Sequence, residues 1–134
     1  MLWVGDPDSQ KSAYLSNMSL FIASLNSGSN GNCYYIGNHD EAILVDAGIS
    51  CRETERRLKR LELSIKKIKA IFISHEHTDH IYGVSRLSRK HHIPIYITST
   101  TLRHGRLTLK ENLIASFSAL EPVQIGNLSV IAFP

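Results

Sequence analysis

The chain has 134 residues, of which 43% are hydrophobic and 20% are charged, and its formal net charge is +3. This length fits one domain with a core of its own, and the composition excludes an intrinsically disordered chain. No run of about 18 apolar residues is present to span a membrane. Residues 1–17 lack the basic start and apolar core of a secretory signal, so we expect a cytoplasmic protein.

The domain is expected to begin at residue 18. Residues 1–17 are polar, contain Pro7 and show no periodicity, so they are interpreted as an N-terminal appendage to a domain at residues 18–134. The expected strands are residues 18–25, 33–37, 42–46, 69–74, 95–98, 113–117, 122–125 and 128–133. The expected helices are residues 51–61, 80–90 and 100–107.

The order of these elements predicts a mixed α/β domain with layers of sheet and helix. Residues 26–32 (NSGSNGN) are rich in turn formers and favour antiparallel hairpins among the first strands. Ser50 lies three residues before Glu53, which is the spacing of a capping box at a helix start. Residues 69–74 (KAIFIS) are almost all apolar, as is typical of a central buried strand.

Positive charge concentrates between residues 52 and 69. The basic residues there are Arg52, Arg56, Arg57, Lys59, Arg60, Lys66, Lys67 and Lys69. Clustered lysine and arginine can neutralise the phosphates of a nucleic acid. The interpretation that we favour is a solvated helix face, because Glu53, Glu55 and Glu62 interleave and no aromatic residue joins the cluster to stack on bases.

The two cysteines, Cys33 and Cys51, are too few for a disulfide scaffold. They are far apart in the sequence and lack the C-x-x-C spacing of a metal or redox site. We therefore expect both to be buried or incidental thiols, since free cysteine behaves as a small hydrophobic residue.

A dense group of potential metal ligands follows the buried strand. Residues 74–80 read S-H-E-H-T-D-H and place His75, His77, Asp79 and His80 on the loop before a helix. Side chains two residues apart in an extended chain point the same way, so His75 and His77 can reach one ion. Asp79 and His80 lie past the bend and face a second ion. Asp79 also lies near a helix N-terminus, where the helix dipole favours a carboxylate.

Two other interpretations of residues 74–80 are weaker. A histidine-rich turn that arose by chance does not account for three histidines and an aspartate at this spacing after such a strand. A structural zinc site usually contains cysteine and fills every coordination position with protein ligands, whereas this motif has no cysteine. A catalytic metal site, held by rigid elements and open to a cleft, therefore fits the residues best.

This motif resembles the H-x-H-x-D-H signature of the metallo-β-lactamase superfamily. The resemblance implies an αββα sandwich and two divalent metal ions, most often zinc, with manganese or iron as other candidates. It also implies that His75 and His77 belong to the first metal site, and Asp79 and His80 to the second. Residues 43–48 (ILVDAG) resemble the family's strand that ends in an aspartate, so Asp46 would orient a ligand histidine or the loop. A simple turn residue at the strand end is the alternative for Asp46.

The resemblance extends over almost the whole chain. Residues 24–34 (SLNSGSNGNCY) and residues 72–75 (FISH) are similar to the YycJ/WalJ-like branch of bacterial single-domain hydrolases, which implies action on a nucleic acid or another phosphodiester. Ser29, Asn30 and Asn32 are expected at the rim of the site, where small residues and backbone N–H groups can approach a phosphate. An ordinary hairpin turn is an equally good interpretation of this segment.

The ligand set implied by the family is not complete in this sequence. A third histidine ligand is expected soon after a strand like residues 128–134, and a bridging aspartate and another histidine later, but the sequence ends at Pro134. We therefore expect the N-terminal half of a hydrolase, with weak metal binding. The other histidines match no ligand and are expected on the surface: His39, His91, His92 and His104.

The resulting hypothesis is a phosphodiesterase or nuclease that acts through a water activated on two metal ions, with Asp79 as the catalytic carboxylate that orients this water or accepts its proton. A thioester or lactam hydrolase of the same fold is the first alternative. A non-catalytic fragment that binds another chain is the second. Residues 18–134 are expected to form one sheet with one apolar face uncovered, and such a face leads to self-association.

Overall fold

The computed structural model describes residues 2–5 and 19–134, which form two β-sheets and a layer of helices. The larger sheet has the strand order β2-β3-β4-β5-β6-β7 and the smaller has the order β1-β9-β8. The strands of the larger sheet are β2 (Phe21–Asn26), β3 (Cys33–Gly37), β4 (Ala42–Val45), β5 (Ile68–Phe72), β6 (Ile95–Ile97) and β7 (Ile114–Ser116). Those of the smaller sheet are β1 (Leu2–Gly5), β8 (Val123–Ile125) and β9 (Leu128–Ala132).

The larger sheet changes from antiparallel to parallel pairing at β4. Strands β2, β3 and β4 pair antiparallel, which confirms the hairpins expected around the glycine-rich turn. Strands β4, β5, β6 and β7 pair parallel. Ala70, Ile71 and Phe72 of β5 are fully buried, so this strand is the central buried strand that its apolar sequence predicted.

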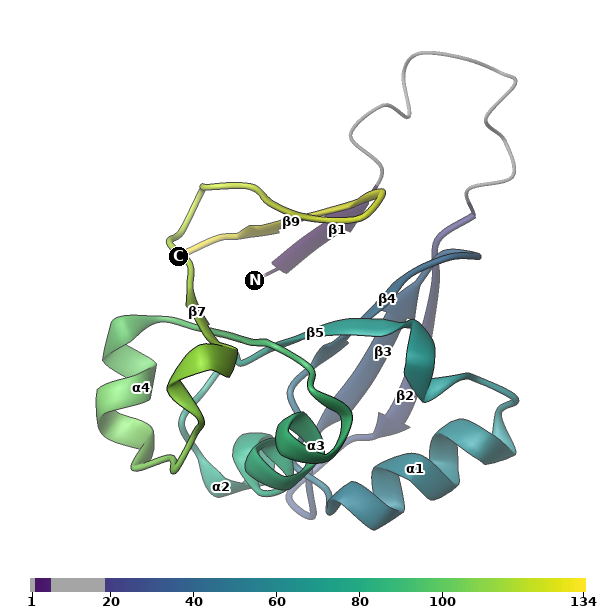
Figure 1. Cartoon of the computed structure of the whole chain (residues 1–134), viewed down its shortest axis with the longest axis horizontal. Coiled ribbons are helices and arrows are strands. Elements are labelled where there is room, and N and C mark those ends of the chain that lie inside the picture. The colour runs from purple at the N-terminus through teal and green to yellow at the C-terminus, as the bar shows by residue number, and fades with distance from the viewer. Residues whose placement is uncertain (1, 6–18) are drawn as a thin grey trace.

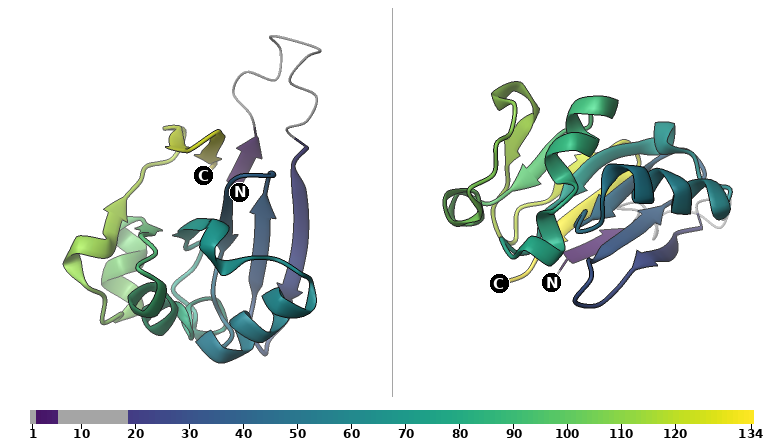
Figure 2. Two further views of the ribbon diagram at one scale, coloured as in Figure 1. Left: turned by 45° about the vertical axis from the view of Figure 1, so that its right-hand side comes forward. Right: turned by 90° about the horizontal axis from the view of Figure 1, so that it is seen from below.

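The helices cover one face of the larger sheet, and the smaller sheet lies against the other face (Figure 1). Figure 2 gives two further views, in which the purple β1 and the yellow β9 lie side by side. The helices are α1 (Cys51–Arg60), α2 (Thr78–Ile81), α3 (Val84–His91) and α4 (Ser99–Gly105), with short 3₁₀ turns at Ile65–Lys67 and Glu111–Leu113. No helix among the described residues is long and apolar enough to cross a bilayer.

Helix α1 begins at the cap that the sequence predicted. The Ser50 hydroxyl accepts a hydrogen bond from the backbone N–H of Glu53 (3.1 Å). The Glu53 carboxylate accepts hydrogen bonds from Arg56 and Arg57, which lower its pKa to about 2. Arg57 also donates to the carbonyl oxygen of Leu25, so this arginine ties α1 to β2 and is not simply part of a solvated face.

The sequence predicted a single helix at residues 80–90, and this prediction is wrong. The structure has two helices there, α2 and α3, which are separated at Gly83. The Gly83 N–H donates to the carbonyl oxygen of Ala47 (2.8 Å). A Cβ atom at Gly83 would lie 1.9 Å from the carbonyl oxygen of Ile49, so only glycine fits this approach. The chain therefore bends where it crosses the loop after β4.

Apolar side chains fill the space on both faces of the larger sheet. Leu58 of α1 and Leu87 of α3 belong to the core on the helical face. Between the two sheets, Phe72 belongs to the same buried cluster as Leu128 and Val130 of β9. Phe72 also stacks on Tyr96, with ring centroids 4.7 Å apart. The arrangement is thus helix, sheet, sheet, which corresponds to three layers of the expected αββα sandwich.

The expectation of a single sheet with one bare face is wrong, because β1, β9 and β8 form a second sheet on that face. No strand was predicted at the N-terminus, yet β1 pairs antiparallel with β9, with Val4 opposite Val130. This pairing depends on residues more than a hundred positions apart, which local periodicity does not reveal. Residues 1 and 6–18 lie outside the described residues, so the division between appendage and domain at residue 18 stays a prediction.

The second sheet leaves the β2 side of the larger sheet partly uncovered. Ile22 of β2, which pairs with Ile36 of β3, is 67% exposed. A cavity of about 710 Å³ extends from Ile22 of β2 to Phe117, and its lining also includes Asp46, His75 and His80. An apolar surface of this kind favours association.

We therefore expect the 134-residue chain to associate with copies of itself through this β2 side. Ile22→Lys should shift the population toward monomer, because a charge would have to be buried in the contact. Leu61→Lys is the matched control, since Leu61 is an exposed leucine at the end of α1. Sedimentation velocity at micromolar concentration measures the effect. A monomeric wild-type chain, or an equal effect of both variants, would contradict the expectation.

Candidate metal centre

The histidine-rich segment lies where the central strand β5 leaves the sheet and α2 begins. His77 occupies the N-cap position of α2, which begins two residues earlier than the sequence predicted. Asp79 therefore lies in the first turn of this helix, close to the helix N-terminus as expected. The ring centroid of His75 lies 6.0 Å from that of His77 and 4.8 Å from that of His80. The structure thus brings all three imidazoles of the motif to one place.

The buried carboxylate of Asp46, directly after β4, holds this segment. Its Oδ1 accepts a hydrogen bond from the backbone N–H of Ser74 (2.8 Å), and its Oδ2 accepts one from the Ser74 hydroxyl (2.5 Å). Oδ2 also lies 2.7 Å from Nδ1 of His80. Asp46 adopts a left-handed φ of +62°, a conformation that aspartate tolerates better than most residues. Asp46 therefore contacts both the strand end and the ligand helix.

The contact with Asp46 fixes which nitrogen of His80 can bind a metal ion. An ionised carboxylate only accepts hydrogen bonds, so the imidazole proton lies on Nδ1 and Nε2 keeps its lone pair. This Nε2 lies 3.6 Å from Oδ2 of Asp79. Two ligands on one tetrahedral zinc ion lie about 3.4 Å apart, given bonds of about 2.0–2.1 Å. His80 and Asp79 therefore fit a shared divalent ion.

Ser74 orients the ring of His75 much as Asp46 orients the ring of His80. Its hydroxyl donates to Asp46, so its oxygen accepts from Nδ1–H of His75 (2.9 Å) and leaves Nε2 of His75 available. The sequence pattern alone indicated no role for Ser74. The signal for it was only its place before the first histidine, because its partner Asp46 lies 28 residues earlier in the chain.

The glycine-rich loop contacts the motif from the other side. The Asn32 side chain donates to Oδ2 of Asp79 (3.2 Å), and its backbone N–H donates to the Asp79 carbonyl oxygen (2.6 Å). Gly48 packs so closely here that an added Cβ atom would lie 1.8 Å from the Asp79 carbonyl oxygen. The loops around residues 32, 48 and 79 therefore hold one another in place.

Ser29 and Asn30 are exposed and line a cavity of about 870 Å³ that also reaches Thr78 and Asp79. Their expected place at the rim of a site is compatible with this cavity, whereas Asn32 is directed to Asp79. The segment is also the turn between β2 and β3, so it serves as hairpin and cavity wall together. Contact of these residues with a substrate stays a prediction.

The motif's donor atoms are not drawn tightly together in this structure. Within the described part of the chain, no three of them lie within 4.8 Å of one another. The arrangement is open, with His75 and His77 exposed and His80 and Asp79 half-buried. The division of the four residues between two ions therefore stays a prediction.

The remaining histidines divide into two groups. His39, His92 and His104 are exposed, as expected. His91 is only partly exposed, and its Nε2 atom lies 2.7 Å from Oε1 of Glu55. Both cysteines are buried, in agreement with the sequence analysis.

Comparison with known proteins identifies the family of this chain. The family model of the metallo-beta-lactamase superfamily matches residues 27–131. The chain belongs to the metallo-β-lactamase superfamily. It is 36% identical over 121 residues to the exodeoxyribonuclease YycJ of Bacillus anthracis, with 87% of this chain covered. It is also 36% identical over 87 residues, or 65% of this chain, to the exodeoxyribonuclease WalJ of Streptococcus pneumoniae. The chain spans 45% of the first relative and 32% of the second.

Solved structures of this superfamily share the fold. The metallo-β-lactamase SMB-1 matches with a TM-score of 0.65 at 15% identity, covering 79% of this chain and 47% of that one. FEZ-1 from Legionella gormanii gives the same TM-score of 0.65, also at 15% identity, and covers 79% of this chain and 47% of its own. At identities this low, the similarity shows the fold alone. These structural matches confirm the sandwich fold expected from the sequence.

The role of Asp46 can be tested by Asp46→Asn. Asparagine tolerates the left-handed backbone, but its amide cannot accept every hydrogen bond that the carboxylate accepts. Zinc affinity should fall about 10–100-fold, as is usual when the partner of a ligand histidine is lost. Calorimetric titration with zinc measures this. The control is Asp40→Asn, because Asp40 is exposed and its carboxylate contacts His39 outside the motif. An unchanged affinity for Asp46→Asn would show that His80 does not depend on Asp46.

Proposed function

We propose that this protein is a metal-dependent hydrolase that cleaves phosphodiester bonds of nucleic acids. The observation that carries the proposal is the arrangement of Asp46, His80 and Asp79 at the end of the parallel strands β4 and β5. Asp46 is hydrogen-bonded to Nδ1 of His80, and Nε2 of His80 lies 3.6 Å from the Asp79 carboxylate. Open α/β sheets commonly bind ligands at such strand ends. The relatives in Bacillus anthracis and Streptococcus pneumoniae are exodeoxyribonucleases, which supports the substrate class.

The residues proposed to hold two divalent ions, zinc first among the candidates, are His75, His77, Asp79 and His80. When bound, these ions supply a water of lowered pKa, about 7, and stabilise negative charge. The protein's own part is orientation, since Asp46 fixes the proton on Nδ1 of His80 and Asn32 holds the Asp79 carboxylate. We assign to Asp79 the orientation of the attacking water or acceptance of its proton.

The surface beside Asp79 suits a nucleic acid. The cavity of about 870 Å³ is lined by small polar side chains, by Ile49, by the ion pair of Glu53 with Arg57, and by Tyr82. Tyr82 is exposed and can stack on a base. Exposed basic residues of α1, including Arg52 and Lys59, add positive charge to the helical layer. Positive charge of this kind attracts phosphates without regard to sequence. We also propose a cytoplasmic location, where DNA and RNA substrates are found.

A thioester or lactam hydrolase is the second candidate. The structural similarity to metallo-β-lactamases such as SMB-1 favours it. At 15% identity that similarity concerns the fold, whereas the relatives at 36% identity carry nuclease names. A fold hosts many activities, so the nuclease proposal is preferred.

The activity is tested on the purified protein as its gene encodes it, with single-stranded DNA, double-stranded DNA and RNA, and with a β-lactam and a thioester in parallel. His77→Ala and Asp79→Ala should each lower nuclease turnover by at least about a hundredfold, because each removes a ligand or proton acceptor. His104→Ala should leave turnover unchanged, since His104 is exposed on α4. Hydrolysis of a lactam or thioester without cleavage of any nucleic acid would refute the substrate assignment.

A further inference from the structure

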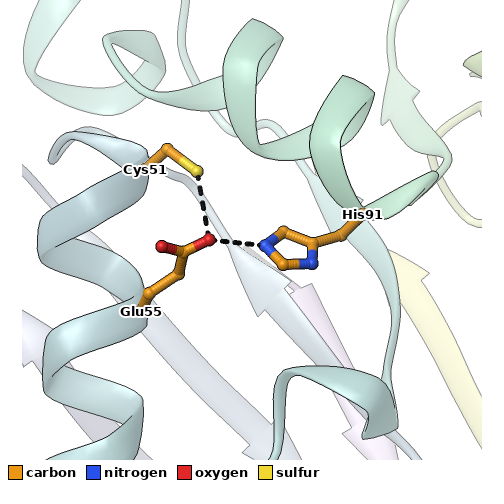
Figure 3. Close-up of side chains that lie close together, drawn as sticks. All are labelled: Cys51, Glu55 and His91. Carbon is orange, nitrogen blue, oxygen red and sulfur yellow. Dashed lines mark hydrogen bonds and ion pairs between the residues drawn. The ribbon is translucent and has the colours of Figure 1, made fainter.

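A second group of potential metal ligands lies outside the histidine-rich segment. Cys51 is the first residue of α1, Glu55 lies one turn later on the same helix, and His91 is the last residue of α3. Figure 3 shows the three side chains directed toward one another across the two helices. Their donor atoms all lie within 4.8 Å of one another.

One carboxylate oxygen lies at the centre of this group. Cys51 Sγ is 3.6 Å from Oε1 of Glu55, and His91 Nε2 is 2.7 Å from the same oxygen. Cys51 is 3% exposed, while Glu55 and His91 are half-buried. Residues four apart share one face of a helix, so Cys51 and Glu55 hold this spacing through the helix itself.

We propose that Cys51, Glu55 and His91 bind a thiophilic divalent cation, with zinc as the preferred ion and a water in the fourth position. Thiolate, carboxylate and imidazole are the three kinds of ligand that zinc takes from proteins. Sulfur and oxygen ligands on one tetrahedral zinc ion lie about 3.5 Å apart, close to the observed 3.6 Å. The shorter contact between His91 and Glu55 has to open by less than about 1 Å, which half-buried side chains can allow.

The protonation of Cys51 depends on whether a cation is bound. Burial, and to a smaller extent the Glu55 carboxylate, raises the pKa of the Cys51 thiol. Without a bound cation, Cys51 therefore keeps its thiol proton. A divalent cation reverses this preference, because it stabilises the thiolate. Binding forms a sulfur–metal bond and releases the thiol proton to solvent, with no change of oxidation state.

Lys90 is the competitor for Glu55. Its Nζ lies 2.6 Å from Oε1, and its side chain is 54% exposed, so it can move into solvent when a cation binds. Without a cation, Lys90 and His91 would only form ion pairs that join α3 to α1. A bound ion would join the same two helices more firmly, by three ligand bonds.

The absorption spectrum of bound cobalt(II) distinguishes this site from the histidine-rich segment, because residues 74–80 contain no cysteine. Titration of the 134-residue chain should produce a thiolate-to-cobalt charge-transfer band in the near ultraviolet. Cys51→Ala should abolish the band, and His91→Gln should weaken cobalt binding at least tenfold. Cys33→Ala should keep the band, since Cys33 is the other buried cysteine. His77→Ala should keep it as well, which makes the result independent of the proposed activity.

Circular dichroism establishes that each variant is folded, and His91→Gln keeps the test decisive if Cys51→Ala does not fold. Zinc should raise the melting temperature of the wild type and of His77→Ala, and this increase should be smaller in His91→Gln. A wild-type chain without the cobalt band would overturn the proposal. A band that survives Cys51→Ala, or that disappears in Cys33→Ala, would also overturn it.

Discussion

The carboxylate of Asp46 is the contact on which the histidine-rich segment depends. A buried carboxylate is stable only when its oxygens are hydrogen-bonded, and Asp46 meets this requirement with the backbone and hydroxyl of Ser74 and with Nδ1 of His80. These partners belong to the end of β5 and to α2. The same three contacts that stabilise the buried charge therefore fix the backbone before the first ligand and the ring of the last one.

The surrounding fold keeps Asp46 in this position. Its backbone N–H donates to the carbonyl oxygen of Phe72, which extends the pairing of β4 and β5 by one residue. Phe72 in turn is buried between the two sheets, while Leu44 of β4 is buried under the helices. Close packing on both faces leaves little freedom for the strand ends. The segment that carries the ligands can thus be open to solvent and still be held in position, because Asp46 bonds it to a rigid sheet.

Local patterns in the sequence predicted the elements that local chemistry determines. The apolar run of β5, the cap at Ser50 and the spacing of the histidines each depend on residues a few positions apart, and the structure has all three. Contacts between distant residues were not predictable in this way. The pairing of β1 with β9, the break at Gly83 and the bond from Ser74 to Asp46 all require knowing which segments meet in space. The pair of Cys51 and His91 around Glu55 is of the same kind, since α1 and α3 are separate in sequence.

The central claim is that Asp46 prepares His80 to bind a divalent ion through Nε2. Anomalous diffraction at the zinc absorption edge, from crystals grown with zinc, tests this most directly. The account predicts an anomalous peak beside Nε2 of His80 and the Asp79 carboxylate, with Nδ1 of His80 still hydrogen-bonded to Asp46. A zinc ion bound to Nδ1 of His80, or the absence of any peak at residues 75–80, would contradict it.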